Sequence, residues 1–183
     1  MKNHILSALR LTLVMLVIVG IYSGIVYAGS KVLPTHGNAE IINYKGQKFY
    51  ANIGQEFKSP KYFHGRPSAV NYNAAGSAGS NKGPSNEEYL QTVQKRIDTL
   101  KMQNPEMQDV KVPVELVTAS GSGLDPDISP EGAEYQAKRV AKERKIPLDK
   151  IESLIAVHTE KSAFGPSKVN VLKLNIALDE LKY

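Results

Sequence analysis

Twenty consecutive uncharged residues near the N-terminus, Leu11–Ser30, constrain this chain more than any other feature. At 1.5 Å per residue, a helix of this length spans roughly 30 Å, which matches the hydrocarbon core of a bilayer. Gly20 and Gly24 form a small-xxx-small pair that would let another helix approach closely. The sequence therefore predicts a cytoplasmic tail over 1–10, a transmembrane helix over 11–30 and a soluble domain over 31–183.

The charges before the span bear on its orientation. Lys2 and Arg10 precede it with no acidic residue, which favours an inside N-terminus and an outward-facing domain. We therefore expect a single-pass protein of the bacterial inner membrane, although Lys31 on the far side weakens the bias. The alternative is an exported binding module released by signal peptidase, since Val26–Ala28 resembles a cleavage site. The apolar run exceeds the ~7–15 residues usual for a signal peptide, which favours a retained anchor.

Composition excludes several classes of function. The chain has no cysteine, which excludes disulfides, thiolate metal sites and cysteine nucleophiles. The formal net charge is +5, with 23 basic and 18 acidic residues, and Lys2 and Arg10 account for two of the basic ones. The small remaining surplus is spread over the soluble region without clustering, so we expect no nucleic-acid partner.

Hydrophobic periodicity and turn residues predict one α+β domain with a small β-sheet and about three helices. The predicted helices cover 85–104, 129–144 and 148–158. The predicted strands cover Glu40–Tyr44, Gln47–Ile53, Val112–Thr118 and Val169–Leu178. Lys45–Gly46 is the predicted hairpin turn between the first two. Between the second strand and the first helix, residues 59–84 are rich in Gly, Asn, Ser and Pro, and a loop of this length is usually functional or disordered. Its aromatic residues predict that at least its first half is docked.

Two helix starts carry capping signals. Ser85 with Glu88 fits the capping box S-x-x-E, so Ser85 is the predicted N-cap. Ser129 followed by Pro130 fits an N-cap with proline at the first helical position.

The glycine-rich stretch Gly79–Ser85 superficially resembles a phosphate-binding loop. That motif requires Lys directly after its second Gly and a helix following at once. Here Lys82 precedes Gly83, and Pro84 removes an amide donor. A tight glycine-dependent loop entering a capped helix is the better interpretation.

A serine nucleophile is also a weak candidate. Ser120 and Ser122 lie in a Gly-rich stretch, but neither has glycine at both positions of G-x-S-x-G, and His158 is the only obvious base. Asp125 and Asp127 could coordinate a hard cation, yet the same pattern is typical of turns and helix caps. We predict no catalytic, cofactor or metal site.

Several blocks of sequence, taken in order, resemble a known family. They are Tyr62–Ala69, Gly79–Asn86, Val114–Pro130, Gln136–Arg144, His158–Glu160 and Val169–Asn175. With the single N-terminal span, these blocks are similar to the C subunit family of the Kdp potassium-importing P-type ATPase (KdpC). One departure is Asp127, where the family often has histidine.

The resemblance implies a non-catalytic accessory subunit of a four-subunit inner-membrane complex. Its partners would be a potassium-binding channel-like subunit, a P-type ATPase subunit and a small single-span subunit. ATP and potassium would be handled by the complex, with no cofactor bound firmly by this chain. Consistently, the chain lacks the Asp-Lys-Thr-Gly phosphorylation motif.

Two roles stay open at this stage. The family is credited with a catalytic-chaperone effect that supports ATP binding by the ATPase subunit. An outward-facing domain cannot touch cytoplasmic ATP, and its position favours a cap over the external potassium entrance that stabilises the assembly.

Candidate contact positions come from the ordered Gly-rich regions, because such loops carry function on a rigid scaffold. They are His64, Arg66, Asn81, Gly83, Ser120, Gly123, Asp125 and Gln136. For helix packing inside the membrane, the candidates are Gly20 and Gly24.

Overall fold

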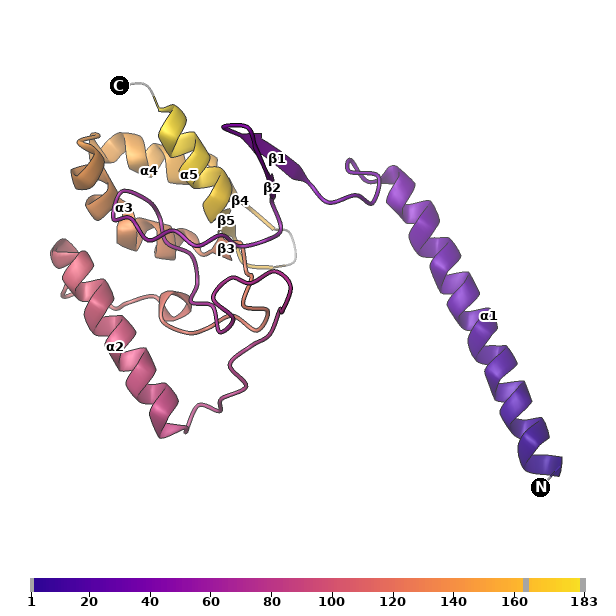
Figure 1. Cartoon of the computed structure of the whole chain (residues 1–183). Helices are drawn as coiled ribbons and strands as arrows, with labels where there is room; N and C mark the ends of the chain where they lie inside the picture. The colour runs from indigo at the N-terminus through magenta and orange to yellow at the C-terminus, as the bar shows by residue number, and fades with distance from the viewer. Residues whose placement is uncertain (1, 163–164, 182–183) are drawn as a thin grey trace. The chain divides into compact units, whose positions relative to one another are not determined.

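The computed structural model describes residues 2–162 and 165–181, which divide between Glu40 and Ile41 into two compact units (Figure 1). The first unit contains one long helix, α1 (Lys2–Val32). Its segment His4–Val32 is long and apolar enough to cross a membrane. The predicted helix over 11–30 therefore exists, and α1 extends it in both directions.

The second unit opens with a β-hairpin. Strands β1 (Ile41–Tyr44) and β2 (Gln47–Tyr50) pair antiparallel, with Ile41 opposite Tyr50. Both turn residues have positive φ, 49° at Lys45 and 78° at Gly46, as a type I′ turn requires. The predicted hairpin is confirmed, although β2 ends three residues earlier than expected.

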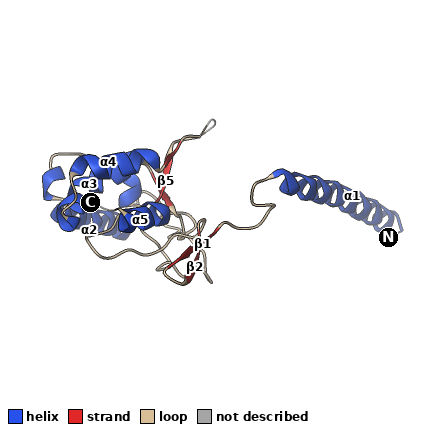
Figure 2. Cartoon of the chain, turned by 90° about the horizontal axis from the view of Figure 1, so that it is seen from above, coloured by secondary structure: helices blue, strands red, loops and turns tan. Residues whose placement is uncertain are grey.

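A second small sheet has three short antiparallel strands (Figures 1 and 2). Strand β5 (Lys168–Asn170) lies between β3 (Asp127–Ile128) and β4 (Thr159–Glu160). This sheet brings together residues about 40 positions apart and seats the N-terminus of the last helix.

Four α-helices in the described part of the second unit surround the core. They are α2 (Glu87–Gln103), α3 (Pro130–Arg144), α4 (Leu148–Val157) and α5 (Val171–Glu180). Val140 of α3, Ile151 of α4 and Leu174 of α5 have no exposed surface and meet in one hydrophobic cluster. The α+β class is confirmed, with one more helix and one more small sheet than expected.

The predicted strand over Val169–Leu178 is wrong beyond Asn170. The Asn170 side chain accepts a hydrogen bond from the amide of Lys173, at 3.0 Å, and so caps the start of α5. Leu174 and Leu178, four residues apart, are both buried on one face of that helix. Apolar residues at every second position include such pairs at i and i+4, so the alternation did not discriminate between strand and helix.

The predicted strand over Val112–Thr118 is also wrong. Its middle forms a 3₁₀ turn, η2 (Val114–Leu116), preceded by Pro113, which lacks a ladder donor. A second 3₁₀ turn, η1 (Pro105–Met107), follows α2. The hydroxyl of Thr118 donates to the carbonyl of Val114 at 2.8 Å, which closes the η2 turn locally.

One capping prediction is wrong and the other is confirmed. Asn86, not Ser85, caps α2 by accepting from the amide of Tyr89 at 2.9 Å, and Glu88 pairs instead with Lys82. Ser129 caps α3 as expected, accepting from the amide of Gly132 at 2.9 Å.

Residues 51–86 form neither helix nor strand, yet the first half of this stretch is firmly docked. Phe63 is fully buried in the core and Tyr62 packs against Phe57 with ring centroids 5.5 Å apart. The expectation of a docked irregular segment is confirmed. The side chains that dock it define the candidate site.

Candidate partner-contact surface

Two buried amide side chains hold the backbone of consecutive residues in the irregular segment. Asn175 of α5 accepts from the amide of Phe63 at 2.9 Å and donates to its carbonyl at 2.9 Å. Gln136 of α3 does the same for His64, at 2.8 and 3.0 Å. Each carboxamide thus offers the donor and acceptor that a neighbouring β-strand would offer. We call this pair the amide clamp.

Arg139 extends the amide clamp with a buried positive charge. Its side chain is 3% exposed and donates to the carbonyls of Pro60 and Tyr62, to Gln136 Oε1 at 2.8 Å and to Asn104 Oδ1 at 3.1 Å. All four acceptors are neutral oxygens. Burial lowers the pKa of Arg139 to about 10, which still leaves the guanidinium charged at neutral pH.

The irregular segment is also tied to the loop after η2. Arg66 Nη1 lies 2.8 Å from Asp125 Oδ2, and the hydroxyl of Ser68 donates to the carbonyl of Gly123 at 2.6 Å. Gly123 has φ +68°, and a Cβ there would come within 2.7 Å of the Ala78 carbonyl oxygen. Only glycine fits at this position, because any other residue would have a strained backbone and its Cβ would clash with the backbone of Ala78.

The serines of this loop hold its backbone through hydrogen bonds. Ser120 is buried; its hydroxyl accepts from the amide of Gly123 at 2.9 Å, and its own amide donates to the carbonyl of Pro67 at 3.2 Å. The Ser122 hydroxyl likewise accepts a local amide. Within residues 2–162 and 165–181, no hydrogen bond joins either serine to His158, so the structure does not assemble a nucleophile with a base.

The acidic candidates are engaged by cations of the chain itself. Asp125 is paired with Arg66, and Asp127 with Lys168 at 2.9 Å. Across the described part of the chain, no group of three or more His, Cys, Asp or Glu is arranged to hold a metal ion.

The pKa of His64 is lowered by burial and by the nearby charge of Arg139, which disfavours its cationic form.

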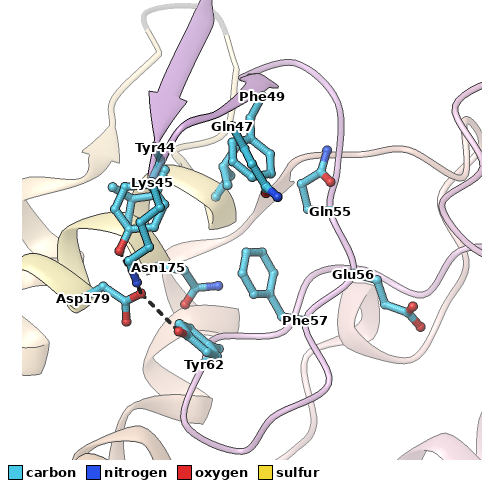
Figure 3. A pocket seen from close by; sticks show the side chains of 12 residues that line it. Tyr44, Lys45, Gln47, Phe49, Gln55, Glu56, Phe57, Tyr62, Asn175 and Asp179 are labelled. Carbon is cyan, nitrogen blue, oxygen red and sulfur yellow. Dashed lines mark hydrogen bonds and ion pairs between the residues drawn. The ribbon is translucent and has the colours of Figure 1, made fainter.

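Asp179 of α5 joins the hairpin to the irregular segment at the edge of a cavity of about 270 Å³ (Figure 3). Its carboxylate accepts from the hydroxyls of Tyr44 and Tyr62, at 2.9 and 3.1 Å, and contacts Lys45 at 3.2 Å and Arg144 at 2.6 Å. Burial would raise the pKa of Asp179, but these hydrogen bonds outweigh it and hold the pKa below its usual value.

A second cavity, of about 360 Å³, lies between α2 and the clamped segment. Lys95 and Arg96 line it together with His64 and Gln136, and none of its described lining residues is a carboxylate. Arg96 also donates to the carbonyl of Val117 at 3.0 Å, which joins α2 to the η2 turn. These contacts hold a preformed surface of loops in place through hydrogen bonds within the chain.

Known proteins resemble this chain along its whole length. The family model described as the c chain of the K⁺-transporting ATPase, KdpC, matches residues 5–180. The chain belongs to the KdpC family. A potassium-transporting ATPase KdpC subunit of Flavobacterium johnsoniae is 52% identical over 184 residues, covering all of both chains. The corresponding subunits of Flavobacterium psychrophilum and Bacteroides fragilis are 50% and 46% identical, with coverage of 100% and 97% of each chain.

Membership of the KdpC family confirms the resemblance drawn from the sequence. Proteins of this family are named as subunits of the potassium-transporting ATPase, and the chain is accordingly an accessory subunit rather than the catalytic one.

The structure brings most of the candidate contact residues into one connected region. The group linked through the clamp and the loop ties consists of His64, Arg66, Ser120, Gly123, Asp125 and Gln136. Asn81 and Gly83 are exposed, and no hydrogen bond among the described residues joins either of them to this group. Gln136 has no exposed surface, so its influence on a partner passes through the backbone that it holds. Contact with a partner stays a prediction for all of these residues.

The sequence reasoning missed the residues that organise this region. Asn104, Arg139, Asn175 and Asp179 were not selected as site residues. One signal was available for Arg139: it lies three residues after Gln136, so both share one face of a helix whose other buried residues are mostly apolar.

Replacing Gln136 by leucine should destabilise the domain strongly. The substitution keeps the side-chain size but leaves the amide and carbonyl of His64 without partners, which should lower the free energy of unfolding by about 2–4 kcal/mol. Urea unfolding of the full chain in detergent, followed by circular dichroism, measures the change. Gln94→Leu on the exposed face of α2 is the matched control and should cost at most about 0.5 kcal/mol. Equal effects of the two substitutions would contradict the clamp.

The Asp179 cluster predicts a loss of stability in acid. Because the hydrogen bonds to Asp179 hold its pKa below the usual value in the folded state, its charge stabilises the fold above the unfolded-state pKa. That contribution is lost as the pH falls through the lower folded-state pKa. Asp179→Asn should therefore cost about 1–3 kcal/mol near pH 7, and the difference from wild type should shrink below about pH 4. A constant difference between pH 7 and pH 3 would show that the charge contributes nothing.

Proposed function

We propose that this chain stabilises a potassium-importing ATPase by docking a preformed extracytoplasmic surface on its partner subunits. One observation carries the proposal. Three buried polar side chains of the domain, those of Gln136, Arg139 and Asn175, bind the backbone of an irregular surface segment. These side chains determine the shape of a surface, and ordered loops on a rigid scaffold commonly carry a protein's binding function. A domain built in this way recognises other proteins.

The orientation belongs to the same proposal. We propose that residues 1–10 lie in the cytoplasm, that 11–30 span the inner membrane and that 31–183 face outward. The positive charges of Lys2 and Arg10 before the apolar run support this arrangement. A domain in that position can cover the external entrance of the potassium pathway.

The partners we propose are the potassium-binding channel-like subunit, the P-type ATPase subunit and the small single-span subunit. The names of the relatives, each a subunit of a potassium-transporting ATPase, support an assembly of this kind. Potassium and ATP would then be bound by the partner subunits. Any effect on ATP affinity would reach the cytoplasmic side through α1 or through those partners.

The anchor helix offers a test of the assembly that leaves the domain untouched. A Cβ at Gly20 or Gly24 would meet nothing within 4 Å in this chain, so larger side chains there cost nothing internally. If a partner helix packs against these glycines, Gly20→Leu with Gly24→Leu should reduce co-purification of the ATPase and potassium subunits about tenfold, equivalent to about 1.4 kcal/mol. Tagged pull-down from native membranes, with quantitative mass spectrometry, measures it.

Gly29→Leu is the matched control. Gly29 is nine residues from Gly20, half a turn away on the opposite face of α1, and its Cβ position is equally open. It should leave co-purification unchanged.

The same preparation gives the intact mass: loss of about 28 residues would support the exported alternative. A rise in the KM of the ATPase for ATP when the chain is removed would support the catalytic-chaperone role as well. Recovery of the wild-type chain without either large subunit would refute the proposed function.

A further inference from the structure

The outward side of the β1–β2 hairpin carries an apolar pair that is half exposed. Residues 41, 43, 48 and 50 alternate to this side, which we call the outer hairpin face. Ile41 and Tyr50 lie opposite each other in register and are 49% and 50% exposed. Asn43 and Lys48 form the next pair, and both are exposed.

The hairpin cannot turn this face inward. Its other side, with Tyr44 and Phe49, lines the cavity above α5 (Figure 3). Tyr44 and Lys45 are bound to Asp179, and Asn170 Nδ2 donates to the carbonyl of Ala51 just after β2, at 2.8 Å. Because side chains alternate strictly along a strand, fixing one side of the hairpin fixes the exposure of the other. Ile41 and Tyr50 are therefore held in an exposed position.

The outer hairpin face is covalently close to the apolar helix. Strand β1 begins nine residues after Val32, the last residue of α1. Nine residues reach at most about 30 Å when fully extended. Here they are not extended, since turns at His36 and Asn38 close hydrogen bonds to residues three positions earlier. If α1 spans a membrane, the hairpin is confined to the neighbourhood of that membrane's surface.

The chemistry of the face fits a lipid surface. Tyrosine and branched aliphatic side chains favour the boundary between headgroups and acyl chains, and lysine favours lipid phosphate. Lys48 is the only charged residue on the outer hairpin face, and it makes no ion pair among the residues that the structure describes. We infer that the outer hairpin face rests on an anionic bilayer, with Ile41 and Tyr50 in the headgroup region and Lys48 beside phosphate.

A protein occupant fits the face less well. Stable protein interfaces use about 20–30 residues on each side, whereas the outer hairpin face has four. A bilayer needs no such area, because the anchor already supplies the affinity and the hairpin only has to orient the domain. This inference requires α1 to be in the membrane but does not depend on the proposed ATPase partners.

The chain contains no tryptophan, so the fluorescence of a single introduced tryptophan reports the surroundings of that position alone. We would insert purified full-length Tyr50→Trp into nanodiscs of mixed phosphatidylcholine and phosphatidylglycerol, with or without bromine on the acyl chains. The indole at position 50 should emit at shorter wavelength than a solvent-exposed one and lose intensity in brominated lipid. Ile41→Trp, at the cross-strand neighbour, should behave in the same way. Met102→Trp, at a side chain 79% exposed near the end of α2, is the control and should not be quenched.

Charge is tested in the same nanodiscs. Lys48→Gln in the Tyr50→Trp background should weaken quenching in anionic lipid and change little in pure phosphatidylcholine. Quenching at positions 50 and 41 no stronger than that at position 102 would overturn the inference, as would protection of these positions that appears only when partner subunits or a second copy are bound. Circular dichroism matching wild type verifies that each variant is folded. Failure of the wild-type chain to enter nanodiscs would instead contradict the anchor itself, and the inference with it.

Discussion

The fold depends on side chains that supply hydrogen-bond partners to a backbone lacking any sheet of its own. The segment Pro60–His64 inserts Phe63 into the core without a neighbouring strand, and each buried N–H and C=O there needs a partner. Asn175, Gln136 and Arg139 provide these partners from α5 and α3. The segment is held in place only when both helices are correctly packed. Helix packing and the shape of the loop surface are therefore formed together.

This arrangement bears on how the domain would bind a partner under the proposed function. The irregular segment would lose conformational entropy on binding a partner if it were mobile, and that loss would weaken the complex. Here the amide clamp and the Arg66–Asp125 pair remove that freedom during folding. The Asp179 cluster does the same for the hairpin. Under the proposed function, the domain is a docking module whose surface is formed before a partner binds.

Sequence reasoning succeeded where one local signal dominates. The apolar run predicted α1, the Lys45–Gly46 turn predicted the hairpin, and Ser129–Pro130 predicted the start of α3. It failed where tertiary contacts determine the secondary structure or the hydrogen-bond partners of a residue. Alternating leucines after Asn170 suit both a strand and a buried helix, and only packing against the core selects α5. The clamp was not predictable, because the partners of Gln136 and Asn175 lie 72 and 112 residues away.

Native-state hydrogen exchange of the isolated full chain in detergent tests the preformed surface most directly. The amides of Phe63 and His64 are bonded to the side chains of Asn175 and Gln136. If the clamp orders the segment before any partner binds, these two amides should exchange as slowly as those in the middle of α3. Exchange as fast as that of the exposed Gly83 would show that the segment is disordered in the free chain, and would contradict the account.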